Sequence, residues 1–225
     1  MVTPAKTFEL RPPKAPNLPI APVQYTQQYQ DQVLNALRLY FNQIDNLGQG
    51  LTGGLGGSFL YFPFIAAYYY PDQYASADNT ATQVLWNGNS GISGFTLNTD
   101  NTATASQSGT YKITYSLQFA NTDSQIQEAT VWLRKNGTAV TGTGSKYAVT
   151  AKHGSVDGYL IAVANFFVDV AAGDYIELMW SAANYASSGG ALGVWIYSRA
   201  AQTSPMAYPA TPSALGSIID RKSVV

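Results

Sequence analysis

A repeating strand pattern fills most of this chain, from residue 59 to its end at residue 225. The clearest example is the segment 111–119, where Tyr, Ile, Tyr, Leu and Phe alternate with Lys, Thr, Ser and Gln. A period of two places one face of a strand in a core and the other toward polar surroundings. Because many short runs of this kind follow one another without a helical pattern, the sequence predicts an antiparallel sandwich or barrel.

The remaining strand-like runs are separated by turn residues. They are expected at 83–87, 95–98, 103–106, 129–135, 138–140, 159–170, 175–180 and 192–198, with a last short segment at a sheet edge within 213–225. Asn136-Gly137 lies between two of these runs and predicts a hairpin with a type I′ turn. Gly88 is expected to close the run that precedes it, and residues 171–174 are expected to reverse the chain.

Six prolines fall within residues 1–24, a density that forbids helix and favours an extended backbone. Such a segment has no core of its own, so it is either a flexible linker or a chain laid along the surface of a partner. Phe8 and Leu10 form a short apolar pair, followed by Pro12 and Pro13. These four residues are the candidate anchor, and docking on a partner is the favoured interpretation.

Residues 25–47 contain neither Gly nor Pro and predict a helix. Its apolar residues recur at spacings of four, three, four and three, which is a heptad seam: Val33, Leu37, Tyr40, Ile44 and Leu47. Gly48 is expected to end the helix as a C-cap. Packing against its own domain is one interpretation. Self-association as a trimerising stalk is favoured, because a Pro-rich arm and a Gly-rich segment flank the helix, although it is short for an independent coiled coil.

The segment 48–58 is rich in glycine and is interpreted as a flexible linker between the stalk and a head domain at residues 59–225. Gly48, Gly50 and Gly53 match the pattern G-x-G-x-x-G of dinucleotide-binding proteins. That chemistry needs a strand before the glycines and a helix after them, so that a helix N-terminus faces the phosphates. Here a predicted helix precedes them, and more glycine follows.

Only 11% of the residues are charged, against about 25% in an average globular domain. A small domain so poor in charge risks an apolar surface, and burial between subunits is the simplest remedy. The net charge of −1, without a basic patch, argues against binding to nucleic acid. The longest apolar stretch, residues 59–71, is too short to span a bilayer, so no membrane segment is expected.

No catalytic or cofactor-binding residues are predicted. A serine triad needs an imidazole, and the only histidine, His153, lies in a segment that reads as a turn. With no cysteine, thiolate metal sites are absent as well. Asp72, Asp78 and Asp100 lie in loop-like, oxygen-rich segments, which leaves a calcium site open. Solvated loop carboxylates are the favoured interpretation of these three residues.

Four phrases, at residues 108–118, 131–138, 170–178 and 209–213, occur in an order that resembles the trimeric jelly-roll head of the tumour-necrosis-factor and complement-globular-head type. In addition, the run 8–46 is similar to the arm and helix that precede such heads in virion proteins of marine tailed phages. The resemblance implies a jelly-roll sandwich and a homotrimer that packs around an axis through aromatic-rich faces.

From these features we expect a non-enzymatic virion structural protein: a trimeric capsid (head) fibre or decoration protein of a tailed phage, anchored by its N-terminal arm on the virion exterior. The alternative is a tail-fibre protein that recognises a host surface glycan or protein. Both interpretations share every feature of the sequence. The expected partners are two further copies of the chain and a capsid or tail protein, with no nucleic acid, membrane or cofactor.

Overall fold

The computed structural model describes residues 14–24, 26–52, 62–188 and 190–220. The chain divides into two compact units, residues 1–61 and residues 62–225. The predicted anchor, Phe8, Leu10, Pro12 and Pro13, lies outside the described residues, as do residues 53–58 of the predicted linker. Each unit is described by itself below.

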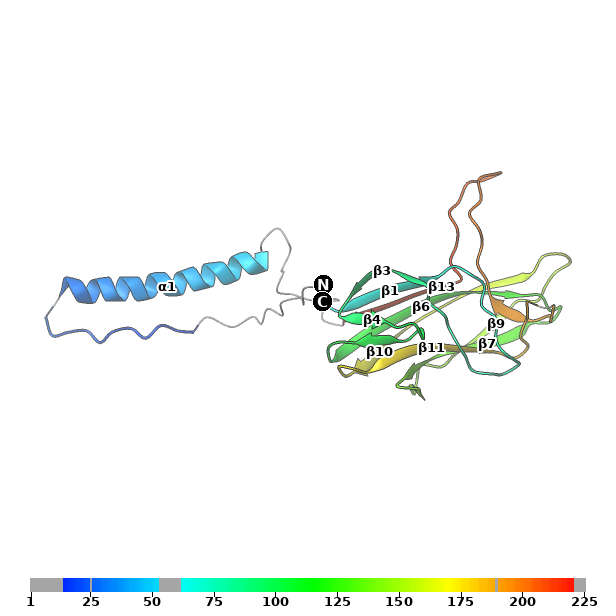
Figure 1. Cartoon of the computed structure of the whole chain (residues 1–225), viewed down its shortest axis with the longest axis horizontal. Helices are drawn as coiled ribbons and strands as arrows, with labels where there is room; N and C mark the ends of the chain where they lie inside the picture. Colours follow the sequence, from blue (N-terminus) through cyan, green and yellow to red (C-terminus); the bar gives the residue numbers. More distant parts are fainter. Residues whose placement is uncertain (1–13, 25, 53–61, 189, 221–225) are drawn as a thin grey trace. The chain divides into compact units, whose positions relative to one another are not determined.

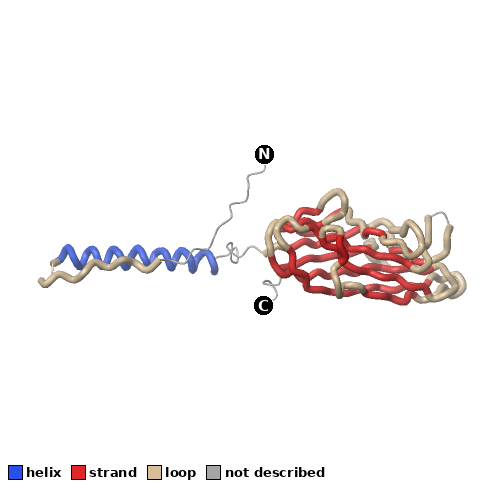
Figure 2. Tube along the Cα trace, turned by 90° about the horizontal axis from the view of Figure 1, so that it is seen from below, coloured by secondary structure: helices blue, strands red, loops and turns tan. Residues whose placement is uncertain are grey.

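The first unit contains α1 (Gln27–Thr52), preceded by residues 14–24 without helix or strand (Figure 2). Thr26 caps its N-terminus, because its Oγ1 accepts a hydrogen bond from the backbone N–H of Tyr29 at 3.3 Å. The predicted end at Gly48 is wrong, since the helix continues to Thr52. A glycine inside a helix costs only about 1 kcal/mol relative to alanine, which the helical hydrogen bonds around it can outweigh.

The second unit is built from strands. They are β1 (Phe64–Tyr69), β2 (Thr82–Gln83), β3 (Gly88–Ser93), β4 (Phe95–Leu97), β5 (Ala103–Ala105), β6 (Gly109–Asn121), β7 (Gln127–Lys135), β8 (Thr138–Ala139), β9 (Ser145–Val149), β10 (Gly158–Val170), β11 (Tyr175–Ala182), β12 (Val194–Ile196) and β13 (Ala214–Asp220). The protein is therefore mainly β, as the strand pattern predicted.

The strands form two antiparallel sheets, consistent with a β-sandwich (Figure 1). Sheet A has the order β10-β6-β13-β1-β3, and β12 also pairs with β6. Sheet B has the order β4-β5-β11-β7-β8, with β2 on β11 and β9 on β7. The prediction of an antiparallel fold is confirmed.

The core lies between the sheets and contains the apolar face of β6. Tyr111, Ile113, Tyr115, Leu117 and Phe119 are all buried, and the residues that alternate with them from Lys112 to Gln118 are only partly covered. From sheet B, the fully buried Trp180 meets Phe119 with ring centroids 5.7 Å apart. Each such side chain contributes about 1.5–3 kcal/mol on burial, so the alternation predicted for residues 111–119 supplies a substantial part of the core.

The turn at Asn136-Gly137 has the predicted conformation. Both residues have positive φ, 51° and 75°, as a type I′ turn requires, and they join β7 to β8. The turn at 171–174 also reverses the chain, but it does not close a hairpin. Because β10 pairs with β6 in sheet A and β11 pairs with β7 in sheet B, this turn carries the chain from one sheet to the other.

Three strand predictions are corrected by the structure. The last strand, β13, is not at an edge but lies between β6 and β1, where it pairs with β6 along its whole length and with β1 over residues 214–219. No strand spans residues 83–87, so Gly88 does not close one. The strand β2 ends at Gln83, and Gly88 itself begins β3. Within the run 192–198, only β12 is a strand. In the segment after it, isolated bridges pair Arg199 with Thr211 and Gln202 with Tyr208.

Candidate oligomer interface and surface cleft

An exposed row of apolar side chains runs along β10, the edge strand of sheet A. Tyr159, Ile161, Val163 and Phe167 are 39%, 62%, 55% and 58% exposed. They alternate with residues that point to the core, such as Ala162 and Val168, which are buried. Both faces of β10 thus carry apolar side chains, but only one of the two faces is buried within the single chain.

The strand register extends this row across sheet A. Val163 lies opposite Ser116 of β6, Ser116 lies opposite Leu215 of β13, and Leu215 lies opposite Tyr68 of β1. Directly opposed residues of antiparallel strands share a face, so all four side chains are on the outward side of sheet A. Leu215 is among the exposed large apolar residues.

A second row of directly opposed residues crosses the same strands of sheet A. Phe167 lies opposite Lys112, Lys112 opposite Ile219, and Ile219 opposite Phe64, which is itself exposed. We call the apolar side chains of these two rows, with the neighbouring Ile161 of β10, the apolar face; Ser116 and Lys112 lie among them. Its residues are Phe64, Tyr68, Ile161, Val163, Phe167, Leu215 and Ile219. Exposed apolar surfaces of this kind mark sites of association.

The apolar face is hollowed at its centre. A depression of about 250 Å³ lies between Tyr68, Val163 and Leu215, and its floor includes small residues such as Ala66 and Gly216. A large side chain from another surface would fit this hollow between taller neighbours. The shape therefore adds to the evidence that this face makes contact with another surface.

The predicted heptad seam lies on α1, where Val33, Leu37, Tyr40 and Leu47 are half-buried and Ile44 is exposed. Leu34 and Phe41, seven residues apart, are each more than half exposed and widen the same stripe. In the single chain this helix thus presents large apolar side chains to solvent, which is a typical feature of helices that associate.

The three candidate calcium ligands each accept a hydrogen bond from a backbone N–H, two of them from distant segments of the chain and only Asp100 within its own turn. Asp72 accepts a hydrogen bond from the backbone N–H of Ser198 at 2.7 Å, Asp78 accepts one from Tyr185 at 2.9 Å, and Asp100 accepts one from Thr102 at 3.1 Å. The bonds from the hydroxyl and backbone of Thr102 lower the pKa of Asp100. Among the described residues, no three acidic or histidine side chains come close enough together to hold a metal ion.

His153 occupies the predicted turn. Its backbone N–H donates to the carbonyl of Val156 at 2.9 Å, and that of Val156 donates back at 3.1 Å. The histidine is exposed on the surface.

A second hollow, which sequence reasoning missed, lies on the outward side of sheet A near β12. This aromatic cleft has a volume of about 370 Å³ and is lined by Asp72, Tyr159, Trp195, Tyr197, Arg199 and Tyr208. The only signal in the sequence is the close spacing of Trp195, Tyr197 and Arg199. Tyr159 comes from a distant segment and meets Tyr197 with ring centroids 4.9 Å apart.

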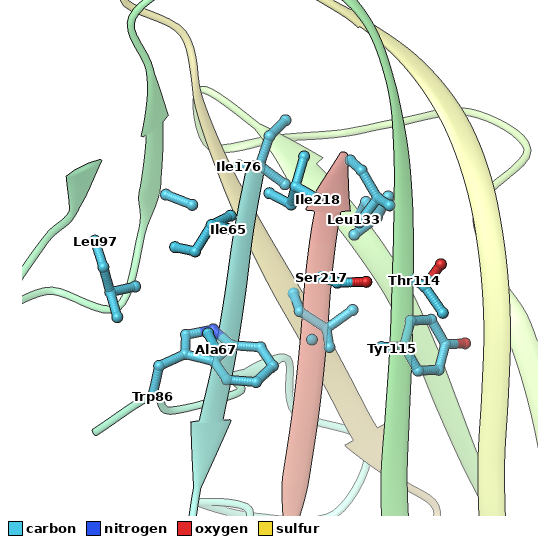
Figure 3. Close-up of a pocket in the computed structure, with 14 residues that line it drawn as sticks. Ile65, Ala67, Trp86, Leu97, Thr114, Tyr115, Leu133, Ile176, Ser217 and Ile218 are labelled. Atoms are coloured by element: carbon cyan, nitrogen blue, oxygen red, sulfur yellow. The ribbon is translucent and has the colours of Figure 1, made fainter. Parts of the chain in front are cut away.

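An internal cavity of about 40 Å³ lies between the two sheets (Figure 3). Its walls are mostly apolar, with Ile65, Leu97, Ile176 and Leu133 among them and the indole of Trp86 at one side. A space this small and apolar lacks the polar partners that a buried water needs, so we interpret it as a packing feature of the core.

Comparison with protein-family models gives no match, and comparison with curated proteins gives none either. Across residues 14–24, 26–52, 62–188 and 190–220, no helix combines the length and the apolar character needed to cross a membrane.

Proposed function

We propose that this chain is a non-enzymatic structural protein of the virion exterior, a homotrimeric capsid (head) fibre or decoration protein of a tailed phage. The observation that carries the proposal is the apolar face of sheet A, together with the exposed stripe of α1 in a separate unit. Two association surfaces in one chain favour an assembly made of several copies. The assignment to a virion rests on the sequence resemblance described above.

The head domain is proposed to be a jelly roll. In support of this, β6 pairs with β10 in sheet A while the strands that directly follow them, β7 and β11, pair in sheet B. Both connections thus cross between the sheets, as in a paired ribbon folded over itself, which is how a jelly roll is built. The final strand then returns to sheet A between β6 and β1.

In the proposed trimer, the apolar face packs against a neighbouring subunit, and the heptad seam packs against the heptad seams of the other copies. A stable interface buries roughly 800 Å² on each partner, which an exposed sheet face of several strands can supply. The low share of charged residues, 11%, is in keeping with a chain that hides much of its surface.

The N-terminal segment is proposed to anchor the trimer on the virion through Phe8, Leu10, Pro12 and Pro13. Prolines reduce the entropy lost when an extended chain is held in a groove, and trimerisation places three such arms side by side. Three linked weak contacts bind far more tightly than one, because the second and third are intramolecular.

The test is the association of the protein with purified virions. Quantitative mass spectrometry should give many tens of copies per particle for a decoration protein, whereas a handful of copies would favour a tail fibre. A chain that lacks residues 1–20 should remain a folded trimer and be absent from the particles. If that truncated chain still copurifies at the normal copy number, the anchor lies elsewhere.

The second candidate is a tail-fibre protein that binds a host surface glycan or protein. The aromatic cleft favours it, because clefts that combine aromatic rings with a few charged groups are typical of ligand sites.

A further inference from the structure

We propose that the aromatic cleft is a binding site for a neutral pyranose sugar, held between Trp195 and the Tyr159–Tyr197 pair and oriented by Arg199 and Asp72. The inference rests on the second candidate function proposed above, to which it adds the class of ligand and the residues that hold it, and it does not depend on the trimer proposal. It is built from the positions and chemistry of these side chains.

The sheet register explains why distant aromatic residues meet here. Ala120 of β6 lies opposite Tyr159 of β10 on one side and opposite Trp195 of β12 on the other. Both rings therefore stand on the outward side of sheet A, with a fully buried alanine between their strands. The small size of Ala120 leaves room for the ring of Tyr197 to reach that of Tyr159 at a centroid distance of 4.9 Å.

Arg199 is held in place by the aromatic pair. Its guanidinium carbon lies 5.1 Å from the ring centroid of Tyr159 and 5.8 Å from that of Tyr197. These cation–π contacts, together with a side-chain hydrogen bond to Tyr197, fix the planar group, and its other N–H donors remain for a ligand. None of the ion pairs between described residues includes Arg199, so no carboxylate competes for these donors at close range.

Asp72 supplies a hydrogen-bond acceptor that complements the donors of Arg199. Its Oδ1 accepts hydrogen bonds from the backbone N–H and from the hydroxyl of Ser198, at 2.7 and 3.0 Å. These bonds fix the carboxylate, and an ionised carboxylate has further lone pairs available to a ligand. The cleft therefore presents one immobilised donor group and one immobilised acceptor group.

This combination suits a sugar ring better than other small ligands. The C–H faces of a pyranose are apolar and pack on aromatic rings, while its hydroxyls both donate and accept hydrogen bonds. Because a carboxylate and a guanidinium line the same cleft, their charges roughly balance, so the attraction of an acidic sugar to Arg199 is offset by its repulsion from Asp72. A neutral sugar is therefore the expected ligand. The volume, about 370 Å³, lies within the usual range of small-ligand sites, roughly 300–1,000 Å³.

The experiment is saturation-transfer difference NMR on the full chain with glucose, galactose, mannose and N-acetylglucosamine as probes, each at about 10 mM because single sugars bind weakly. The wild-type protein should transfer saturation to the ring C–H protons of at least one of them and not to glucuronate. Trp195→Ala and Arg199→Ala should weaken that binding roughly tenfold, as truncation of an anchoring residue does. Ile126→Ala, an exposed apolar residue of the β6–β7 loop, is the matched control and should change nothing.

Asp72→Asn tests the charge argument separately, since it should allow glucuronate to bind where the wild-type protein rejects it. The proposal is overturned if no neutral sugar receives saturation, or if binding survives Trp195→Ala. Light scattering on the same samples distinguishes the other occupant, a neighbouring subunit: a change of assembly mass in the Trp195 or Arg199 variant would assign the cleft to a subunit interface. Loss of sugar binding at unchanged mass leaves the trimer proposal untouched.

Discussion

The indole ring of Trp86 lies against Gly216 so closely that a Cβ at position 216 would stand 2.7 Å from the ring atom Cη2. Residue 216 lies in β13, opposite Tyr115 of β6 and Ala67 of β1, both of which point into the core. Gly216 thus makes room for a large ring from the loop before β3, beside the cavity of Figure 3.

Gly216→Ala is therefore expected to destabilise the head by about 1–3 kcal/mol, the usual cost of overpacking. Urea unfolding followed by tryptophan fluorescence gives the free energy. Gly144→Ala is the matched control, because a Cβ there meets nothing within 4 Å. Equal stability of the two variants would mean that Trp86 can move aside at little cost.

The parts of the fold that sequence reasoning predicted depend on local signals. The alternation in residues 111–119 and the Asn136-Gly137 turn each need only their own neighbours along the chain. The position of β13 depends on partners about a hundred residues away, such as Leu117 opposite Ala214. Gly216 and Ser217 also lower the apparent strand character of that segment, since a glycine in a strand is read as a break. Packing with Trp86 overrides this local weakness.

The candidate sites also divide into features set by neighbouring residues and features set by distant strand partners. The heptad seam is visible in the sequence because a helix repeats within a few residues. The apolar face and the aromatic cleft are not, because Val163, Leu215 and Tyr68 become neighbours only through strand pairing. The sequence indicates only that Tyr159 begins a strand. What it contacts depends on β12, whose register against β6 no local pattern indicates.

The stalk prediction concerns Leu37 and Ile44 of the heptad seam. Leu37→Asp combined with Ile44→Asp would place three like charges in each of two layers of a trimer, at a cost of several kcal/mol. The helix should separate, with loss of helical circular dichroism, while the mass from light scattering stays at about three times 24.1 kDa. A fall to one chain would show that the stalk, and not the head, holds the copies together.

The head prediction uses that double variant as its background, so that only the apolar face can hold the subunits. Adding Val163→Lys should then reduce the mass to that of one chain, because an unpaired charge would be buried at the centre of the interface. Adding Ile126→Lys instead, at a residue 64% exposed and outside the apolar face, should leave the mass unchanged. Retention of the trimer in both triple variants would place the interface on another surface.

The acid prediction concerns Asp123 in the connection between β6 and β7. Its carboxylate accepts hydrogen bonds from the backbone N–H of Gln125 at 3.0 Å and from the side-chain amides of Gln127 and Asn184 at 2.7 and 2.8 Å. The bonds from Gln125, Gln127 and Asn184 lower the pKa of Asp123 below its ordinary value of 3.8.

Because the pKa is lower in the folded protein, Asp123 stabilises the fold above pH 3.8, and this contribution is lost as the pH falls through the folded value. Asp123→Asn should be less stable than the wild type at neutral pH, and the difference should shrink as the pH falls below 3.8 and through the lowered pKa of Asp123. Urea unfolding at a series of pH values measures both. Asp31→Asn on α1, outside the head, is the control. A difference that stays constant with pH would contradict the role of the charge.

The central position of β13 has a consequence for how this protein is made. Sheet A keeps a vacant place between β6 and β1 until residues 214–220 have been synthesised and have left the ribosome. Until then both neighbours expose unpaired backbone groups, a state open to pairing with other chains. The head can therefore close only after residues 214–220 have been made. A chain that stops before β13 would keep these backbone groups unpaired and would be prone to aggregate.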